Sequence, residues 1–174
     1  MAASTFIVVR ERASPVADIE LERLLERVYV GGGYTDPEVG EQVFRAAAIR
    51  SRGDLLMARS SEGGHLIGSI SVVFAGSPAC RFASSGEAEL HLLCVSPEYQ
   101  RGGVGTALVD AAVEHARGRG ATRVILWTQP EMTTAQRLYH RRGFERAPDL
   151  DFTRNNRSFL VLIRDLGAQA RPVT

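Results

Sequence analysis

Apolar positions follow two different periods along the chain, and the period separates expected strands from expected helices. Short runs rich in β-branched and aromatic residues, bounded by turn residues, predict strands. Apolar residues on one face of a helical repeat predict amphipathic helices. The expected strands are 5–10, 54–59, 66–74, 89–95, 122–128 and 157–163, and the expected helices are 15–28, 37–50, 103–120 and 133–142.

The order of these elements predicts an α/β domain with a mixed, mostly antiparallel sheet. The turn residues Ser61–His65 between two strand runs indicate an antiparallel hairpin. Strand 89–95, helix 103–120 and strand 122–128 instead indicate a right-handed crossover, so these two strands should be parallel neighbours. We expect about seven strands and about four helices. A length of 174 residues suits one domain, expected over 1–166, with a polar tail at 167–174.

Composition removes several classes of function. The 21 basic and 20 acidic residues leave a formal net charge of +1, and their even spread indicates no surface for nucleic acid or an anionic membrane. No leader pattern and no run of about 20 apolar residues are present, so a cytoplasmic protein is expected. Cys80 and Cys94 are too few and too far apart for a disulfide framework or a metal site, so we expect reduced thiols and no metal.

The main chemical signal is a glycine-rich turn that follows a strand and opens a long helix. Pro97 stops the strand, and glycines stand at positions 102, 103 and 105. Amides at a helix N-terminus bind anions, and glycines let a diphosphate approach the backbone closely. Arg101 can add positive charge at the rim. A purely structural turn is the alternative interpretation.

Spacing separates this turn from two common phosphate-binding motifs. The dinucleotide fingerprint needs a third glycine three residues after Gly105, where Leu108 stands. The P-loop ends in Gly-Lys-Ser/Thr, and the chain contains no lysine. A different diphosphate ligand is therefore indicated.

Two segments together resemble the GCN5-related N-acetyltransferases. Gln100, Gly103 and Gly105 match that family's turn, Gln/Arg-x-x-Gly-x-Gly/Ala, and Ala135–Phe144 matches its second signature, Ala-x-x-Leu-Tyr-x-x-x-Gly-Phe. The resemblance implies a sheet splayed between strands 89–95 and 122–128, with acetyl-CoA in the opening. It also implies that the turn binds the pyrophosphate of acetyl-CoA.

The resemblance assigns the cofactor site residue by residue. The main chain of the strand ending at Val95 is implied to pair with the pantetheine arm. Met132 stands where many relatives carry an asparagine that helps to hold the cofactor, so one side-chain contact is in doubt. The implied cofactor-binding residues are Leu93, Cys94, Val95, Gln100, Arg101, Gly102, Gly103, Val104, Gly105, Thr106, Met132 and Ala135.

The resemblance also implies the reaction, in which a primary amine attacks the thioester of acetyl-CoA directly in a ternary complex. Tyr139 matches the tyrosine that protonates the leaving thiolate, and a phenol with an ordinary pKa of about 10 is protonated at neutral pH. The alternative for Tyr139 is a packing residue of an amphipathic helix.

Glu89 matches the catalytic glutamate of the histone-acetylating branch, so it is the first candidate for the general base. Strand alternation predicts that Glu89, His91, Leu93 and Val95 share one face. A partly desolvated carboxylate there would have its pKa raised towards neutrality. The alternatives are a solvated strand glutamate, with His91 or a water as the base.

The acceptor stays open, as a primary amine of a small molecule or a peptide. Gly31–Tyr34, Trp127 and Phe152 are expected to wall the acceptor site, although a single tryptophan in an apolar strand is also typical of a core. Two other functions compete with the enzyme: a catalytically silent CoA-binding or sensing domain, and a scaffold whose glycine turn binds no ligand. Many relatives dimerise, so a homodimer is also considered.

Overall fold

The structure, a computed structural model, describes residues 5–167, so the expected tail lies outside the described residues except for Gly167. The strands are β1 (Phe6–Val9), β2 (Asp54–Ser60), β3 (Leu66–Phe74), β4 (Glu87–Val95), β5 (Arg123–Thr128), β6 (Glu145–Arg146), β7 (Phe152–Arg154) and β8 (Arg157–Asp165). The α-helices are α1 (Pro15–Leu25), α2 (Pro37–Val43), α3 (Ala46–Arg52), α4 (Val104–Gly118) and α5 (Thr133–Arg141). A short π-helix at Glu26–Val30 extends α1, and short 3₁₀ helices lie at Pro97–Tyr99 and Pro148–Leu150.

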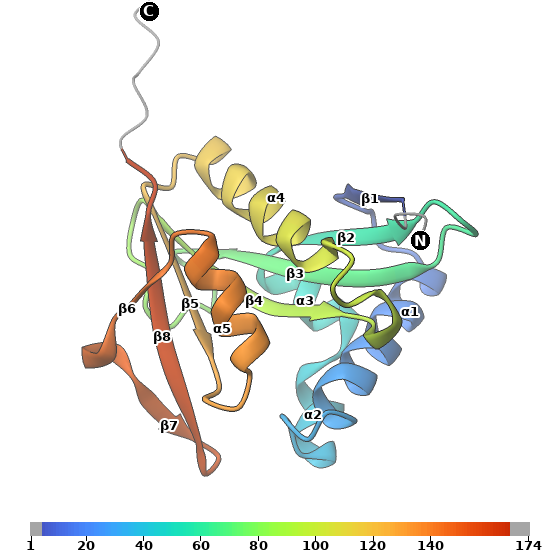
Figure 1. The fold of residues 1–174 in the computed structure, drawn as a ribbon, viewed down its shortest axis with the longest axis horizontal. Helices are drawn as coiled ribbons and strands as arrows, with labels where there is room; N and C mark the ends of the chain where they lie inside the picture. The colour runs from blue at the N-terminus through green and yellow to red at the C-terminus, as the bar shows by residue number, and fades with distance from the viewer. Residues whose placement is uncertain (1–4, 168–174) are drawn as a thin grey trace, which may run out of the picture.

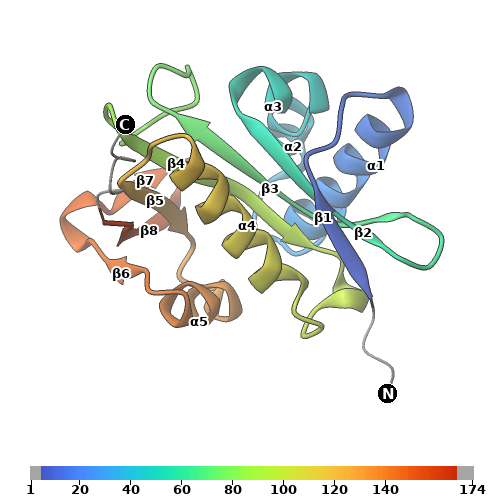
Figure 2. The same ribbon diagram turned by 90° about the horizontal axis from the view of Figure 1, so that it is seen from above.

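The strands form one open sheet in the order β1-β2-β3-β4-β5-β8-β6, with β7 paired to β8 outside this path. Only β4 and β5 pair in parallel, and every other pairing is antiparallel. The expected mixed, mostly antiparallel α/β fold is therefore confirmed, including the crossover through α4. Figure 2 shows α1, α2 and α3 on one face of the sheet and α4 and α5 on the other.

Each face of the sheet carries its own buried cluster. Beneath α4, Leu108 and Ala112 pack with Ile70 and Leu126 from the sheet. On the opposite face, Leu21, Leu25 and Ile49 pack with Met57 and Cys94. Burying each large apolar side chain contributes about 1.5–3 kcal/mol, so these two faces fix the frame on which the site is built.

The single helix expected over 37–50 is wrong, because the chain breaks between α2 and α3. Arg45 is extended, with φ −71° and ψ 119°. The next amide, on Ala46, donates to Glu22 Oε1 at 2.8 Å, so a carboxylate from α1 satisfies an amide at the start of α3. That tertiary cap has no counterpart in the local pattern.

Two short strands, β6 and β7, were not predicted. β7 and β8 form a tight hairpin whose turn residues, Asn155 and Asn156, have φ of 50° and 56°. Asparagine is one of the few residues that adopts positive φ readily, and two in succession suit a primed hairpin turn. The Asn-Asn pair between Phe152 and Phe159 was the signal that could have predicted this hairpin.

Candidate active site

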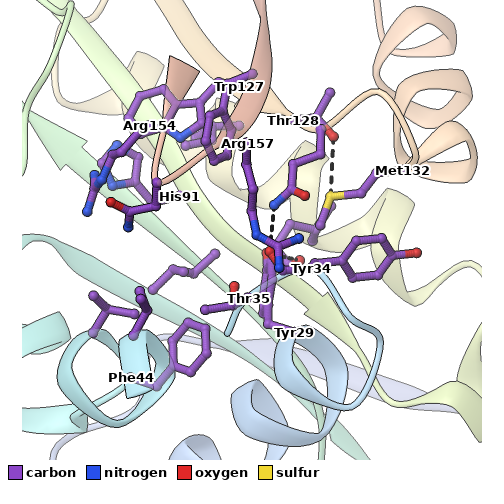
Figure 3. Close-up of a pocket in the computed structure, with 18 of the residues that line it drawn as sticks. Tyr29, Tyr34, Thr35, Phe44, His91, Trp127, Thr128, Met132, Arg154 and Arg157 are labelled. Atoms are coloured by element: carbon purple, nitrogen blue, oxygen red, sulfur yellow. Dashed lines mark hydrogen bonds between the residues drawn. The ribbon is translucent and has the colours of Figure 1, made fainter. Parts of the chain in front are cut away.

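The sheet splays where β4 runs past its pairing with β5. The parallel pairing covers Glu87–Leu90 of β4 and Arg123–Leu126 of β5, whereas β4 continues to Val95. Figure 1 shows the two strands diverging towards their C-terminal ends. The opening is part of a pocket of about 520 Å³ lined from β4, β5, α5, the loop before α2 and the β7–β8 hairpin. Figure 3 shows this pocket.

A bulge in β4 changes which side chains share a face. Leu92 has φ 54°, and the register with β3 shifts between Ser69, opposite Cys94, and Ser71, opposite His91. Leu93 and Val95 consequently pack with the cluster beneath α4, as Leu90 does. The expectation that Glu89, His91, Leu93 and Val95 lie on one face is therefore wrong, because the extra residue in the bulge reverses the alternation.

The glycine turn before α4 fits an anionic ligand. Gly103 is the N-cap of α4 with φ 82°, and it has no side chain to cap the first-turn amides of this 15-residue helix. A Cβ on Gly103 would meet nothing within 4 Å, and residues 100–103 are exposed. Gln100 Nε2 donates to the carbonyl of Val95 at 3.3 Å, which ties the turn to the end of β4. The open space beside free amides suits a diphosphate.

The end of β4 offers main-chain groups, because its side chains are engaged elsewhere. Cys94 is buried, its Sγ lies 3.2 Å from Ser69 Oγ, and burial raises the pKa of its thiol to about 11. Two main-chain carbonyls of this segment also accept hydrogen bonds within the protein: that of Leu93 from the Tyr29 hydroxyl at 2.7 Å, and that of Val95 from Gln100. Cys94 is therefore a protonated packing residue, and only its backbone is suited to a ligand.

Glu89 does not lie where the sequence suggested. Its side chain is fully buried and does not line the pocket. The backbone amides of Arg81, Phe82 and Ala83 donate to its carboxylate, and Cys80 Sγ lies 3.4 Å from it. The expected rise of its pKa is wrong: although burial acts to raise it, hydrogen bonds from His91 and from these amides lower the pKa to about 2.

His91 instead faces the pocket. Its Nε2 lies 2.8 Å from Glu89 Oε2, and its ring centroid lies 4.5 Å from that of Trp127. A carboxylate accepts hydrogen bonds, so Glu89 fixes the proton on Nε2 and leaves Nδ1 as an acceptor in the neutral imidazole. The buried carboxylate therefore sets both the tautomer and the orientation of a histidine in the pocket wall.

Tyr139 lies on α5 and lines the same pocket. Its side chain is buried and packs against Phe144 at a centroid distance of 5.9 Å. Burial raises the pKa of its phenol, so the hydroxyl keeps its proton at neutral pH. Met132 and Ala135 also line the pocket, and Thr128 Oγ1 donates to Met132 Sδ at 3.5 Å.

The pocket extends from this centre towards an aromatic wall. Trp127 contacts Phe82 and Phe152 at centroid distances of 5.8 and 5.9 Å, and Phe152 stacks on Phe159 at 4.9 Å. Trp127 and Phe152 line the pocket as expected. Residues 31–36, called the glycine loop below, contribute Tyr34, Thr35 and Asp36 to the lining, whereas Gly31–Gly33 do not line the pocket.

Long-range hydrogen bonds hold the glycine loop over the site. Gln129 Nε2 donates to the Tyr34 carbonyl at 2.7 Å, and Arg157 donates to the Gly33 carbonyl at 2.8 Å and to Asp36 Oδ1 at 2.7 Å. Gln129 and Arg157 were not predicted from the sequence, and neither were Arg52 and Arg154, which also line the pocket. No local motif marks them, because each reaches the site through the fold.

Two kinds of feature are absent from residues 5–167. Within this range, no group of three histidine, cysteine, aspartate or glutamate side chains is placed to hold a metal ion. No helix in the same range combines the length and the apolar character needed to cross a membrane.

Several known proteins similar to this chain are named as acetyltransferases. The model of the acetyltransferase (GNAT) family matches residues 19–144. An uncharacterised N-acetyltransferase of Methanocaldococcus jannaschii is 43% identical over 58 residues, which cover 33% of this chain and 26% of that protein. A mycothiol acetyltransferase of Cellulomonas flavigena is 40% identical over 85 residues, which cover 48% of this chain and 24% of that protein. The matches thus span only about a quarter of each relative's length.

The fold has similar solved structures. The PaiA N-acetyltransferase of Thermoplasma acidophilum, solved in complex with coenzyme A, superposes with a TM-score of 0.66 at 16% identity, covering 92% of this chain and 99% of that one.

Proposed function

Because the chain belongs to the acetyltransferase (GNAT) family, we propose that it transfers an acetyl group from acetyl-CoA to a primary amine by direct attack in a ternary complex. The observation that carries the proposal is the pocket in the opening between β4 and β5. Its lining includes both His91 and Tyr139, so a proton acceptor and a proton donor border one cavity. Amine acyl transfer needs both.

The glycine turn and the end of β4 are the proposed acetyl-CoA site. The amides of Gly103, Val104, Gly105 and Thr106 would hold the pyrophosphate, with Arg101 adding charge and Gln100 supporting the turn. Gly102 keeps the backbone accessible there. The main chain of Leu93, Cys94 and Val95 would hold the pantetheine arm, and Met132 and Ala135 would border it. Bound acetyl-CoA supplies the activated acetyl thioester and leaves as the CoA thiol.

His91 is the proposed general base, in place of the glutamate suggested by the resemblance. Its Nδ1 is free to accept a proton from the amine, because Nε2 is held by Glu89 at 2.8 Å. Glu89 is a positioning residue in this scheme: its fully buried, multiply hydrogen-bonded carboxylate also stabilises the imidazolium after proton transfer.

Tyr139 is the proposed general acid. Since burial raises the pKa of the phenol, its Oη holds a proton that the departing sulfur can take. An oxygen acid that stays protonated at neutral pH suits a leaving group that is released as an anion.

An assay of thiol release with a panel of primary amines tests this function. Acetyl-CoA alone should raise the melting temperature by mass action, and adding an acceptor should release free thiol with equimolar acetylated amine. A melting shift without thiol release for any amine would instead indicate a silent CoA-binding domain. No shift with acetyl-CoA would indicate a scaffold whose turn binds no ligand.

A further inference from the structure

The acceptor side of the pocket carries an excess of positive charge. Its lining contains three arginines, Arg52, Arg154 and Arg157, against a single carboxylate, Asp36. Arg157 pairs with Asp36 at 2.7 Å, which leaves Arg52 and Arg154 as the uncompensated charges. Neither forms an ion pair with any residue in the range 5–167.

The neighbouring charges do not cancel this excess. Glu89 lies behind His91, but its carboxylate already accepts from His91 and from the amides of Arg81 and Ala83. Arg81, which does not line the pocket, stacks on Phe152 with its guanidinium carbon 3.9 Å from the ring centroid. A purely cationic acceptor, such as a diamine, would therefore meet two free guanidinium groups and no available carboxylate.

Strand geometry relates Arg154 to the proposed general base. The ring centroid of Trp127 lies 4.5 Å from that of His91 and 5.9 Å from that of Phe152. The aromatic wall therefore runs from the proposed base, His91, to β7. Phe152 and Arg154 are two residues apart on β7, and side chains at that spacing leave the same face of a strand about 7 Å apart. Figure 3 draws Arg154 on the same side of the pocket as His91 and Trp127, so the guanidinium and the imidazole border the same part of the cavity.

We propose that the acceptor is an amino acid or a closely related amino carboxylate with an apolar side chain, which rests on the proposed acetyl transfer. The guanidinium of Arg154 pairs with the carboxylate, because its planar fork matches two carboxylate oxygens. Arg52, at the C-terminal end of α3 and also in the pocket lining, adds attraction without a fixed partner. The apolar side chain packs against Trp127, Phe152 and Phe159.

Matched pairs of amines test the inference. The protein saturated with acetyl-CoA is assayed with the standard amino acids and with their decarboxylated counterparts, for example L-phenylalanine and phenethylamine, L-leucine and 3-methylbutylamine, and with putrescine as the dication. A charge-assisted hydrogen-bonded pair corresponds to about tenfold or more, so kcat/KM should favour at least one apolar amino acid over its counterpart by about that factor.

Three variants locate the effect. Arg154→Gln should raise KM for the favoured amino acid about tenfold and leave the decarboxylated amine unchanged, which removes the preference. Arg52→Gln should partly reduce the preference for the amino acid over its decarboxylated counterpart, and should make that preference less sensitive to salt. Arg23→Gln, an exposed arginine on α1 that does not line the pocket, should behave as the wild type.

The outcomes separate this inference from the proposed function. Acetylation of decarboxylated amines or putrescine in preference to every amino acid, or an amino-acid preference that survives in Arg154→Gln, would overturn the inference and leave the transferase intact. Calorimetry with N-acetyl-L-phenylalanine and CoA gives a readout that needs no turnover. Binding that is lost in Arg154→Gln, with no thiol release for any amine, would support the anion site and overturn the transferase.

Discussion

At the scale of single residues, the pair Glu89 and His91 carries the clearest chemical consequence. The sequence predicted the Glu89 carboxylate as the first candidate for the general base, whereas the His91 imidazole is the group that lines the pocket. Their 2.8 Å contact makes the two side chains one functional unit, so substitutions at the two positions should have related but distinguishable effects.

The first prediction concerns the rate of acetyl transfer. His91→Gln should lower kcat by about a hundredfold, the usual scale of general-base catalysis, with acetyl-CoA affinity unchanged. Glu89→Gln should lower kcat less and should shift the acidic limb of the pH–rate profile, because the imidazolium loses its carboxylate partner. Kinetics between pH 6 and 9 measure both. A profile for Glu89→Gln that has the wild-type shape would assign Glu89 to the scaffold alone.

The second prediction is an acid-dependent stability. The pKa of Glu89 is lowered from 4.5 to about 2 in the folded protein, so its stabilisation is present above the unfolded value and is lost as pH falls towards 2. A shift of this size corresponds to about 3 kcal/mol. Urea unfolding at pH 7 and pH 3.5 should therefore show a larger loss of stability for wild type than for Glu89→Gln, which starts less stable at pH 7. Equal losses in the two proteins would contradict the lowered pKa.

The third prediction concerns Tyr139. Tyr139→Phe keeps the packing against Phe144 and removes the proton that the phenol holds. Since that proton is needed only during reaction, kcat should fall by about a hundredfold while acetyl-CoA binding stays within about twofold. Turnover and calorimetry together check it, and unchanged turnover would leave Tyr139 as a core residue.

At the scale of elements, the start of α4 and the bulge in β4 shape the proposed acetyl-CoA site. Blocking the turn with a larger side chain would test the proposed acetyl-CoA site poorly, because the substitution would also disturb the fold. A side chain at Gly103 would be strained at φ 82°, and a Cβ on Gly105 would lie 3.3 Å from Leu138. A charge change at the exposed position 101 avoids both problems.

The fourth prediction uses this position. Arg101→Glu keeps a long side chain at φ 67° and places a negative charge beside the helix N-terminus, so it should weaken acetyl-CoA binding about tenfold or more and reduce the ligand-induced melting shift. Arg101→Gln is the control and should have an intermediate effect. Calorimetry at two salt concentrations measures the charge contribution, and a wild-type affinity in Arg101→Glu would remove the turn from the site.

At the scale of the whole molecule, the pocket proposed to hold the acceptor exists because distant segments meet. The glycine loop is held by Gln129, just after β5, and by Arg157 on β8. Gln129 lies 95 positions after its partner Tyr34, and Arg157 lies 124 positions after its partner Gly33. The homodimer, the cytoplasmic location and the single domain over 1–166 stay predictions at this scale.

The fifth prediction tests that connection. Gln129 is buried, and Gln129→Leu removes its hydrogen bond to Tyr34, which should raise the hydrogen exchange of residues 31–36 and raise KM for the amine about tenfold or less. The exchange of α4 should not change. Gln42→Leu, at an exposed position on α2, is the matched control. Wild-type exchange in Gln129→Leu would show that other contacts hold the loop.

Much of the fold follows from the sequence alone, because the hydrophobic period is a local property. This period predicted six of the strands, the long helix α4 and the parallel crossover. The two signatures predicted the family, which is shown, and the cofactor turn, which stays a proposal. The helix break at Arg45 was not predicted, since it depends on a contact from elsewhere in the fold, that of Glu22 with the Ala46 amide. The hairpin partner of β8 was also not predicted, although the Asn155–Asn156 pair is a local signal for its turn.

The chemistry of the site was decided only by the tertiary structure. Alternation along β4 cannot reveal the bulge at Leu92, and without the bulge Leu93 and Val95 are assigned to the wrong face. No sequence pattern shows that the amides of a loop six to eight residues earlier in the chain surround Glu89. The pKa of Glu89 was therefore expected to rise, whereas the structure lowers it. The pKa of a group depends on its neighbours in space, and so does the grouping of Arg52 and Arg154 around one pocket. The fold alone brings them together.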